Sequence, residues 1–299
     1  MIWIILSLFG HWVGIRCLSQ YTQPIRDDGP KQHEVKAQTP TMGGVVILLG
    51  AILQLWLLDL LLHPISQALL GFGLIGLYDD IKKLYFKNSK GMRAKSKFLL
   101  QMLMAIIIIL QLPKDSHMHI LFQTYDIGIL YVFFASIVIT ATSNAYNLTD
   151  GVDGLAASQG IILLVLFGTV AMMSHQADLV ALSKVLIVML MGFLWFNRYP
   201  ARLFMGDVGS LAIGAALGVF SVMLKMEFLF ALCASVLVFE TLSVILQVAF
   251  FKMGYGRIFK MAPFHHHLEL SGWRETQIVT VFAIVTMIMV LFGIYVYGV

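Results

Sequence analysis

Long apolar stretches recur along almost the whole of this 299-residue sequence, and only short polar connections separate them. Runs such as IIIIL at 106–110 and ILLVLFG at 162–168 contain no polar side chain. Strands of a membrane β-barrel alternate apolar and polar residues, so uninterrupted runs predict the other structure that a bilayer permits, the helix. We therefore expect an all-α polytopic membrane protein.

The apolar stretches are about as long as the roughly 20 residues that a membrane-spanning helix requires. Ten of them fall at roughly 1–20, 42–61, 64–78, 98–112, 128–143, 154–173, 179–196, 208–224, 228–251 and 277–298. Charged residues make up 12% of the chain, about half of the usual share in soluble domains, which excludes an ordinary cytosolic enzyme. We predict about ten transmembrane helices in one integral-membrane domain, residues 1–299.

Basic residues predict the orientation, because Lys and Arg accumulate in cytoplasmic loops. Of the 20 Lys and Arg residues, 16 lie in the connections at 21–41, 79–97, 197–207 and 252–276. We expect these connections to be cytoplasmic and both termini to lie outside. The first stretch has no basic residue before it and no cleavage site, which favours a retained helix over a signal peptide.

Net charge and cysteine content exclude other classes of protein. The net charge of +4 is too small to indicate a nucleic-acid partner. Cys17 and Cys233 both lie in apolar stretches, so they predict neither a disulfide framework nor a metal site.

Acidic residues gather on the same predicted side as the basic loops. Asp79, Asp80, Asp150, Asp153 and Asp207 all fall close to the expected cytoplasmic ends of helices. A single Asp at a helix end is also typical of a cap. Charges near membrane depth usually line a cavity or pair with one another, so five on one face favour a functional site.

The adjacent carboxylates of Asp79 and Asp80 end an apolar stretch and precede seven basic residues. Adjacent carboxylates suit Mg²⁺, which prefers oxygen ligands and binds beside substrate phosphates. The basic residues would neutralise such a phosphate. Read alone, the basic loop is equally typical of topology determination or of attraction to anionic lipid.

Two further polar segments suit a phosphate-bearing ligand. NAYNLTDGVDGLA at 144–156 combines amides, carboxylates and glycines, which favours a pocket for a sugar or base, with a structural turn as the alternative. Asp207 is expected at a helix N-terminus, where backbone N–H groups favour anions and a metal-bridged phosphate would fit. The small residues at 214–218 predict close helix packing.

Three consecutive histidines, His265, His266 and His267, cannot all reach one metal, because neighbours on a helix point about 100° apart. They lack the spacing of a zinc site, so we expect them to bind a diphosphate or orient acidic groups. The segment at 29–44 is as compatible with a helix cap as with a binding site. Glu240, in mid-stretch, is either functional or hydrogen-bonded to a neighbouring helix.

The chain resembles the phospho-N-acetylmuramoyl-pentapeptide transferase family of the polyprenyl-phosphate N-acetylhexosamine-1-phosphate transferase superfamily. The resemblance rests on five segments in the family's order: TPTMGG (39–44), Asp79–Asp80, NLTDGVDGLA (147–156), FMGDVGS (204–210) and HHHLE (265–269). TPTMGG and HHHLE point to the muramoyl-pentapeptide branch. The resemblance implies ten helices, Mg²⁺ as cofactor, a homodimer, and a cytoplasmic active site in the bacterial inner (plasma) membrane.

The resemblance also implies the reaction and the roles of individual residues. Phospho-N-acetylmuramoyl-pentapeptide would move from its UDP conjugate to undecaprenyl phosphate, giving lipid I and UMP in peptidoglycan synthesis. Asp207 would bind Mg²⁺, and Asp79 and Asp80 would be catalytic carboxylates. The resemblance implies that uridine is bound by Lys36, Asn147, Asp150, Asp153 and Phe204, and that the phosphates are bound by Lys83, Lys87 and Lys95. The diphosphate or sugar-peptide would be bound by Asn197, His266 and His267. The catalytic set would comprise Asp79, Asp80, Asp207 and these two histidines. Thr39, Asn144 and His265, from the motifs above, complete the binding set.

Two alternatives remain at this stage. A sibling transferase would move N-acetylglucosamine-1-phosphate to a polyprenyl phosphate and would differ in the histidine segment. A secondary transporter could have the same composition, but it would place its binding site near the bilayer midplane. The acidic residues of this chain fall instead at the predicted cytoplasmic edge.

Overall fold

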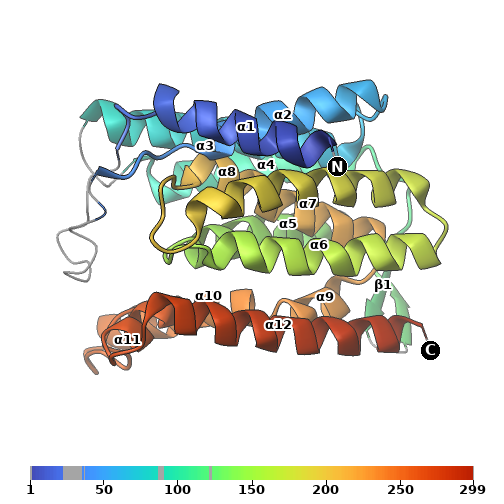
Figure 1. Cartoon of the computed structure of the whole chain (residues 1–299). Coiled ribbons are helices and arrows are strands. Elements are labelled where there is room, and N and C mark those ends of the chain that lie inside the picture. The colour runs from blue at the N-terminus through green and yellow to red at the C-terminus, as the bar shows by residue number, and fades with distance from the viewer. Residues whose placement is uncertain (1, 23–35, 37, 87–90, 121–122, 299) are drawn as a thin grey trace.

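The computed structural model describes residues 2–22, 36, 38–86, 91–120 and 123–298 (Figure 1). Apolar runs form helices throughout this part of the chain, and one antiparallel hairpin pairs His117 with Asp126. The elements are α1 (Ile2–Cys17), α2 (Gly44–Leu57), α3 (Pro64–Phe86), α4 (Ala94–Ile109), β1 (His117–Ile120), β2 (Gln123–Asp126), α5 (Leu130–Thr149), α6 (Leu155–Met173), α7 (Ala177–Asn197), α8 (Gly206–Met223), α9 (Glu227–Cys233), α10 (Ser235–Lys252), α11 (Phe264–Glu269) and α12 (Glu275–Tyr297).

Within the described residues, five helices are long and apolar enough to cross a membrane: α6, α7, α8, α10 and α12. Two shorter apolar helices, α1 and α2, accompany them. The expectation of a helical polytopic membrane protein is therefore confirmed at this level, whereas the number of ten spans stays a prediction.

Two segments depart from the predicted elements. The hairpin between α4 and α5 is an exception to the all-α expectation, and its two strands, residues 117–120 and 123–126, are four residues long and largely exposed. Residues 117–120 alternate between exposed and half-buried positions, as a strand requires. The apolar stretch predicted at 228–251 is divided into α9 and α10 at Ala234.

Helix α8 lies at the centre of the bundle, and every one of its residues except Met223 is buried. It packs most extensively against α3 and α5. A Cβ atom added at Gly214 would lie 2.7 Å from the Cα of Ser143, and one at Gly218 would lie 2.7 Å from the Cα of Ile139. The prediction that small residues of this segment allow close helix packing is confirmed.

Helices α9 to α12 form a layer on one side of the other helices, as Figure 1 shows. The layer contacts the rest mainly through α12 on α6 and α10 on α5. Only 22% of the apolar window of α10, and 22% of that of α12, is buried. Exposed apolar faces of this length suit contact with lipid tails.

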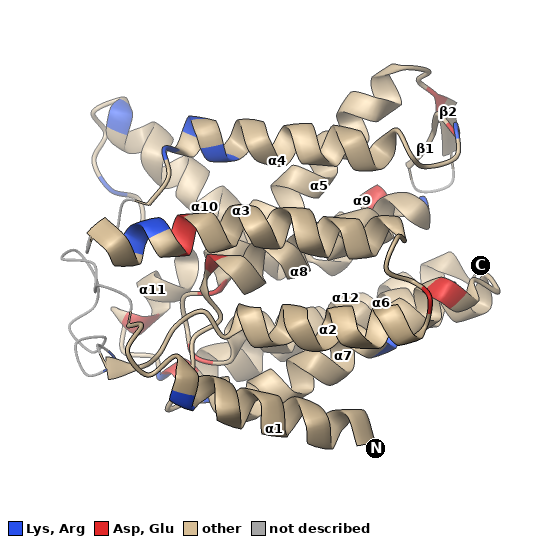
Figure 2. Cartoon of the chain, turned by 90° about the horizontal axis from the view of Figure 1, so that it is seen from above, with Lys and Arg blue, Asp and Glu red and all other residues tan. Residues whose placement is uncertain are grey.

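The charged residues lie near the ends of the helices, and the middle of the bundle is almost free of them (Figure 2). The start of α1 and the end of α12 lie at the same end of the bundle (Figures 1 and 2). The charged end of α3 and the short helix α11 lie at the opposite end. The candidate site is therefore built at the end remote from both termini.

Candidate functional site

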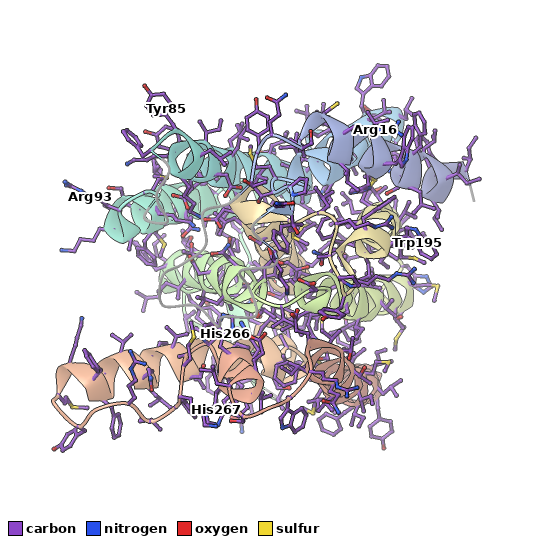
Figure 3. The ribbon with its side chains drawn as sticks, turned by 60° about the vertical axis from the view of Figure 1, so that its left-hand side comes forward. Arg16, Tyr85, Arg93, Trp195, His266 and His267 are labelled. Atoms are coloured by element: carbon purple, nitrogen blue, oxygen red, sulfur yellow. The ribbon has the colours of Figure 1, made fainter. Side chains whose placement is uncertain are left out.

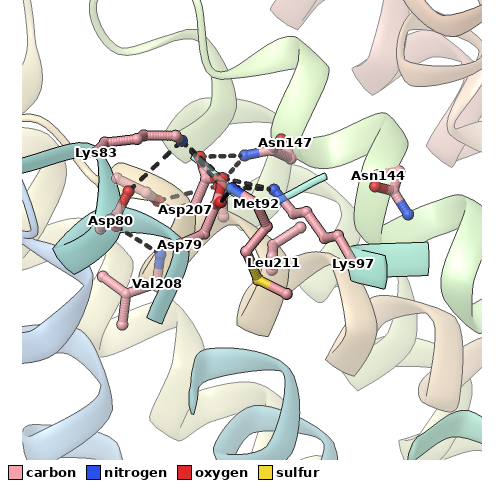
Figure 4. A network of polar contacts seen from close by, with 12 residues as sticks. Asp79, Asp80, Lys83, Met92, Lys97, Asn144, Asn147, Asp207, Val208 and Leu211 are labelled. Carbon is pink, nitrogen blue, oxygen red and sulfur yellow. Dashed lines mark hydrogen bonds and ion pairs between the residues drawn. The ribbon is translucent and has the colours of Figure 1, made fainter. Parts of the chain in front are cut away.

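Three carboxylates and two ammonium groups meet where α3, α4 and α8 converge (Figure 4). We call Asp79, Asp80, Lys83, Lys97 and Asp207 the acid–lysine cluster. One oxygen of Asp207, Oδ2, lies 2.6 Å from Lys97 Nζ and 2.9 Å from Lys83 Nζ. The same two ammonium groups lie 3.2 and 3.1 Å from Oδ2 of Asp79. Two cations thus bridge carboxylates that would otherwise repel one another.

The cluster forms because α3 and the N-terminus of α8 approach closely. A Cβ atom at Gly76 would lie 2.2 Å from the carbonyl oxygen of Asp207, so only glycine permits this distance. One turn along α3, the Asp80 carboxylate accepts a hydrogen bond from the Val208 backbone N–H at 3.0 Å. Asp80 therefore caps the N-terminus of α8 from another helix.

Replacing Gly76 with Ala is expected to destabilise the protein by about 2 kcal/mol, the usual cost of overpacking a tight contact. The added methyl group would meet backbone atoms of α8, which cannot rotate away. Thermal unfolding in detergent measures the effect. Gly10→Ala is the matched control, because a Cβ there makes an ordinary 3.5 Å contact with Val46. Equal melting temperatures for the two variants would contradict the close approach.

Asp80 retains one oxygen that accepts no hydrogen bond. Its Oδ1 atom is buried, and the closest ammonium group in the described cluster, Lys83 Nζ, is 3.8 Å away. Burial and the nearby charge of Asp207 raise the pKa of the Asp80 carboxyl above its ordinary value. A buried carboxylate oxygen that accepts no hydrogen bond, beside two further carboxylates, is a favourable position for a cation.

The residues present fit Mg²⁺ shared with a substrate better than a metal cage. Among the described residues, no three Asp, Glu, His or Cys side chains converge as a ready-made metal site. Lysine ammonium groups lie between the carboxylates instead. Mg²⁺ is usually held by one or two carboxylates together with substrate phosphates, and Asp207 with Oδ1 of Asp80 supplies such donors.

The end of α5 adds an amide to the cluster. Asn147 Nδ2 donates to Asp207 Oδ1 at 3.0 Å and to Ser210 Oγ at 2.7 Å, so it fixes the Asp207 side chain. Asn144 lies outside this network, because its amide donates to Gln101 at 2.8 Å (Figure 4). Asp150 follows α5 and is half-buried. Burial, and then the charges of the neighbouring carboxylates, raise its pKa well above the ordinary value.

A second network of charged residues includes the α5–α6 turn, which contains Asp153. Lys36 Nζ is 2.7 Å from Asp153 Oδ1 and 2.7 Å from the carboxylate of Glu275, the first residue of α12. The backbone N–H of Asp153 donates to Glu275 at 3.1 Å. We call Lys36, Asp153 and Glu275 the clamp. Burial lowers the Lys36 pKa, but the two carboxylates outweigh it, so the pKa is raised and the ammonium form is favoured.

The loop before α8 joins the clamp to the remaining predicted binding residues. The other oxygen of Asp153 accepts from the backbone N–H of Ala201 at 2.9 Å. Asn197 accepts from the N–H of Gly154 at 3.0 Å, which holds the turn from the end of α7. Thr39 Oγ1 lies 3.5 Å from the Ala201 carbonyl, and the Phe204 N–H donates to Pro40 at 2.8 Å. Five of the predicted substrate-binding residues are therefore brought together: Lys36, Thr39, Asp153, Asn197 and Phe204.

The three histidines have separate environments. His265 is fully buried, and its backbone N–H and ring Nδ1 both lie 3.1 Å from the carboxylate of Glu240. Its ring packs against Gly151 of the α5–α6 turn. Glu240 thus makes the hydrogen bond to a neighbouring element that was one of the two interpretations.

His266 and His267 point in different directions from α11, as their labels in Figure 3 show. His266 Nδ1 lies 2.6 Å from Glu269 and faces the main bundle. His267 lies on the far side, where its Nδ1 accepts from the Lys260 N–H at 3.1 Å and its ring stacks on Phe264. The geometry gives His266 the more favourable position for a ligand at the bundle end.

Sequence reasoning missed two residues of these networks. Lys97 and Glu275 were not in the predicted set. Lys95 is exposed, and Lys87 lies outside the described residues. The helical periodicity of α4 could have distinguished Lys97 from Lys95, because side chains two residues apart on a helix point about 200° apart.

The acid–lysine cluster lies entirely within residues 63–225, the segment that matches the family model of glycosyl transferase family 4. The fold and this match identify the chain as a helical membrane protein of that glycosyl transferase family. Residues 36–48, which contain Lys36, match signature 1 of phospho-N-acetylmuramoyl-pentapeptide-transferase.

Curated relatives identify the particular family. A phospho-N-acetylmuramoyl-pentapeptide-transferase of Rickettsia bellii (strain RML369-C) is 42% identical over 94% of this chain and 85% of its own length. Those of Desulfotalea psychrophila (strain LSv54 / DSM 12343) and Clostridium novyi (strain NT) are 44% and 38% identical, each over 92% of this chain and 84% and 87% of their own lengths. The chain belongs to the phospho-N-acetylmuramoyl-pentapeptide-transferase family.

Proposed function

We propose that this chain transfers phospho-N-acetylmuramoyl-pentapeptide from its UDP conjugate to undecaprenyl phosphate, with lipid I and UMP as products. Membership of the family carries the reaction type. The observation that supports the site is the meeting of Asp79, Asp80 and Asp207 with Lys83 and Lys97 at one end of an apolar bundle.

The cluster has the chemistry that phosphoryl transfer requires. Such transfer depends mainly on positioning and on neutralising charge over the phosphate oxygens. Lys83 and Lys97 share Asp207 Oδ2 in the structure, so either ammonium group can turn from this carboxylate to a bound phosphate oxygen. Asn147 keeps Asp207 in place while this occurs.

Mg²⁺ is proposed as the cofactor, with Asp207 as its protein ligand and Asp80 Oδ1 close by. When bound, the ion would neutralise the diphosphate and polarise the phosphorus that is attacked. Asp79 and Asp80 are the proposed catalytic carboxylates. Asp79 shares both lysines with Asp207 and accepts a hydrogen bond from the Met92 N–H, which fixes its orientation.

The lipid phosphate is the proposed nucleophile. An oxygen of undecaprenyl phosphate attacks the sugar-linked phosphorus, a new P–O bond forms, and the bond to UMP breaks. A phosphomonoester has a second pKa near 6, so its dianion is available without a protein nucleophile. The competing route passes through an acyl phosphate on Asp79 or Asp80. Exchange of labelled UMP into the nucleotide sugar in fully delipidated protein would favour that competing route.

The substrate assay tests the proposed function against its rivals. Purified protein receives undecaprenyl phosphate with either UDP-N-acetylmuramoyl-pentapeptide or UDP-N-acetylglucosamine, and UMP release is measured. We expect release only with the muramoyl-pentapeptide conjugate. Release with UDP-N-acetylglucosamine would indicate the sibling transferase, and release with neither would favour transport.

We further propose ten spans, termini outside, and an active site on the cytoplasmic face of the inner membrane. The support is the position of the site at the end of the bundle opposite both termini (Figure 2), together with the basic connections at that end. A homodimer is also proposed from the family resemblance, and the mass of the detergent-purified protein by light scattering tests it.

Cys17 offers a direct test of this orientation. It is exposed at the site end of α1, whereas Cys233 is buried. A membrane-impermeant maleimide is expected to label Cys17 in inside-out vesicles and to leave it unlabelled in intact spheroplasts. Lys114→Cys in a Cys17→Ser background, at the opposite end, should give the reverse pattern. Labelling of Cys17 in spheroplasts would contradict the proposed orientation and indicate the opposite one.

A further inference from the structure

Glu275 connects the last helix to Lys36 and Asp153, two residues of the predicted uridine-binding set, although no motif in the sequence marks it. It is the first residue of α12 and is 7% exposed. Its carboxylate lies 2.7 Å from the Lys36 ammonium group and accepts the Asp153 N–H at 3.1 Å. The Gln277 side chain caps the same helix end by accepting the Arg274 N–H at 2.9 Å. Glu275 is therefore held on a fixed helix terminus.

The clamp, together with the backbone of Ala201, joins four segments that are far apart in the sequence. Lys36 precedes α2, Asp153 lies in the α5–α6 turn, Ala201 precedes α8, and Glu275 begins α12. Both oxygens of Asp153 are engaged, one by Lys36 at 2.7 Å and one by the Ala201 N–H at 2.9 Å. Asp153 thus has its orientation set by its neighbours, and Glu275 fixes both its backbone and its cation.

Two of the three clamp residues, Lys36 and Glu275, lie outside the segment that matches the general family model. The whole acid–lysine cluster lies within residues 63–225, which match the general glycosyl transferase model. Lys36 lies instead in the segment 36–48 that carries the muramoyl-pentapeptide signature, and Glu275 lies beyond the general match. The clamp therefore joins the signature segment and the start of α12 to the α5–α6 turn, which lies within the general match.

We infer that Glu275 is a positioning residue for the nucleotide sugar, acting through Lys36 and Asp153. It contacts neither the acid–lysine cluster nor its lysines in the described network, so it sets the affinity for the donor substrate and leaves the transfer step unchanged. This inference rests on the proposed function, which supplies the donor substrate.

Glu275→Gln tests the inference, because the amide can still accept the Asp153 N–H but no longer pairs with the Lys36 charge. We expect the KM for UDP-N-acetylmuramoyl-pentapeptide to rise about tenfold, as for the loss of one charge-assisted hydrogen bond that orients a binding group. We expect kcat to stay within about twofold. Asp178→Asn is the matched acid-to-amide control. Asp178 is exposed in the first turn of α7, at the opposite end of the bundle, so its replacement should alter neither KM nor kcat.

A double variant shows whether Glu275 acts through Lys36. Residues that act through one contact give non-additive effects, so Lys36→Met with Glu275→Gln should have the KM of Lys36→Met alone, within about twofold. The double variant also removes both charges, which keeps the test available if Glu275→Gln alone fails to fold. Fully additive effects on KM would overturn the inference.

The remaining outcomes separate this inference from the proposed function. A wild-type protein that releases no UMP from the muramoyl-pentapeptide conjugate would overturn the proposed function itself. An active wild type with an unchanged KM in Glu275→Gln, or with a fall in kcat alone, would overturn only the positioning role.

Discussion

Asp207→Asn is expected to lower the rate of UMP release about a thousandfold while the protein still folds, in the range known for removal of a key charge-stabilising group. One Asp207 oxygen contacts both lysines, at 2.6 and 2.9 Å, and the other accepts from Asn147 at 3.0 Å. The neutral amide has the same shape but would lose both ion pairs. It would also bind Mg²⁺ far less well than a carboxylate.

The measurement is UMP release at saturating substrates over a titration of Mg²⁺. Wild-type activity should vanish with a chelator and return with added Mg²⁺, whereas Asp207→Asn should not respond. Thermal unfolding in detergent shows whether the variant folds, and Asp178→Asn provides the matched acid-to-amide control. Near-wild-type turnover in Asp207→Asn would remove the metal assignment.

Lys97→Met is expected to lower kcat about a hundredfold, the scale found when one charged donor to a transition state is removed. Its ammonium group lies 2.6 Å from Asp207 and 3.2 Å from Asp79, and its side chain is largely buried. Methionine fills a similar volume but, among the described residues, leaves the three carboxylates with Lys83 as their close cation. Repulsion among them and a weaker hold on the phosphate both follow.

Lys82→Met is the matched control for this variant. Lys82 lies beside Lys83 on α3 but takes part in none of the cluster's ion pairs within the described residues. Its replacement should change kcat less than about twofold. Equal losses in the two variants would show that total basic charge matters, and not the position of Lys97. The contact of Lys97 with Asp207 would then have no specific role in the transfer step.

Sequence patterns predicted a helical membrane protein and several residues that the structure brings together. Unbroken apolar runs predict helices because period and length leave a bilayer few alternatives. Asp79, Asp80, Asp207 and Asn147 were predicted from separate motifs, and the structure brings them together at one end of α8. The close packing of Gly214 and Gly218 was also predictable, because small residues allow helices to approach.

Tertiary contacts decided the rest. Lys95 and Lys97 are chemically equivalent in the sequence, and only the phase of α4 turns Lys97 towards Asp207. Glu275 lies far along the chain from Lys36 and Asp153, so no local pattern could pair them. The hairpin at 117–126 was missed because it is a short polar connection without a strong strand signal.

The most direct test of the account measures both products of one reaction. Purified protein is mixed with UDP-N-acetylmuramoyl-pentapeptide labelled in the sugar, Mg²⁺, and undecaprenyl phosphate as the limiting substrate, and UMP and lipid-linked label are counted. We expect equal amounts of UMP and of lipid-linked label. Neither product should form when the lipid phosphate is omitted or when Asp207→Asn replaces the wild type. UMP released without lipid-linked label would show hydrolysis in place of transfer and would contradict the central claim.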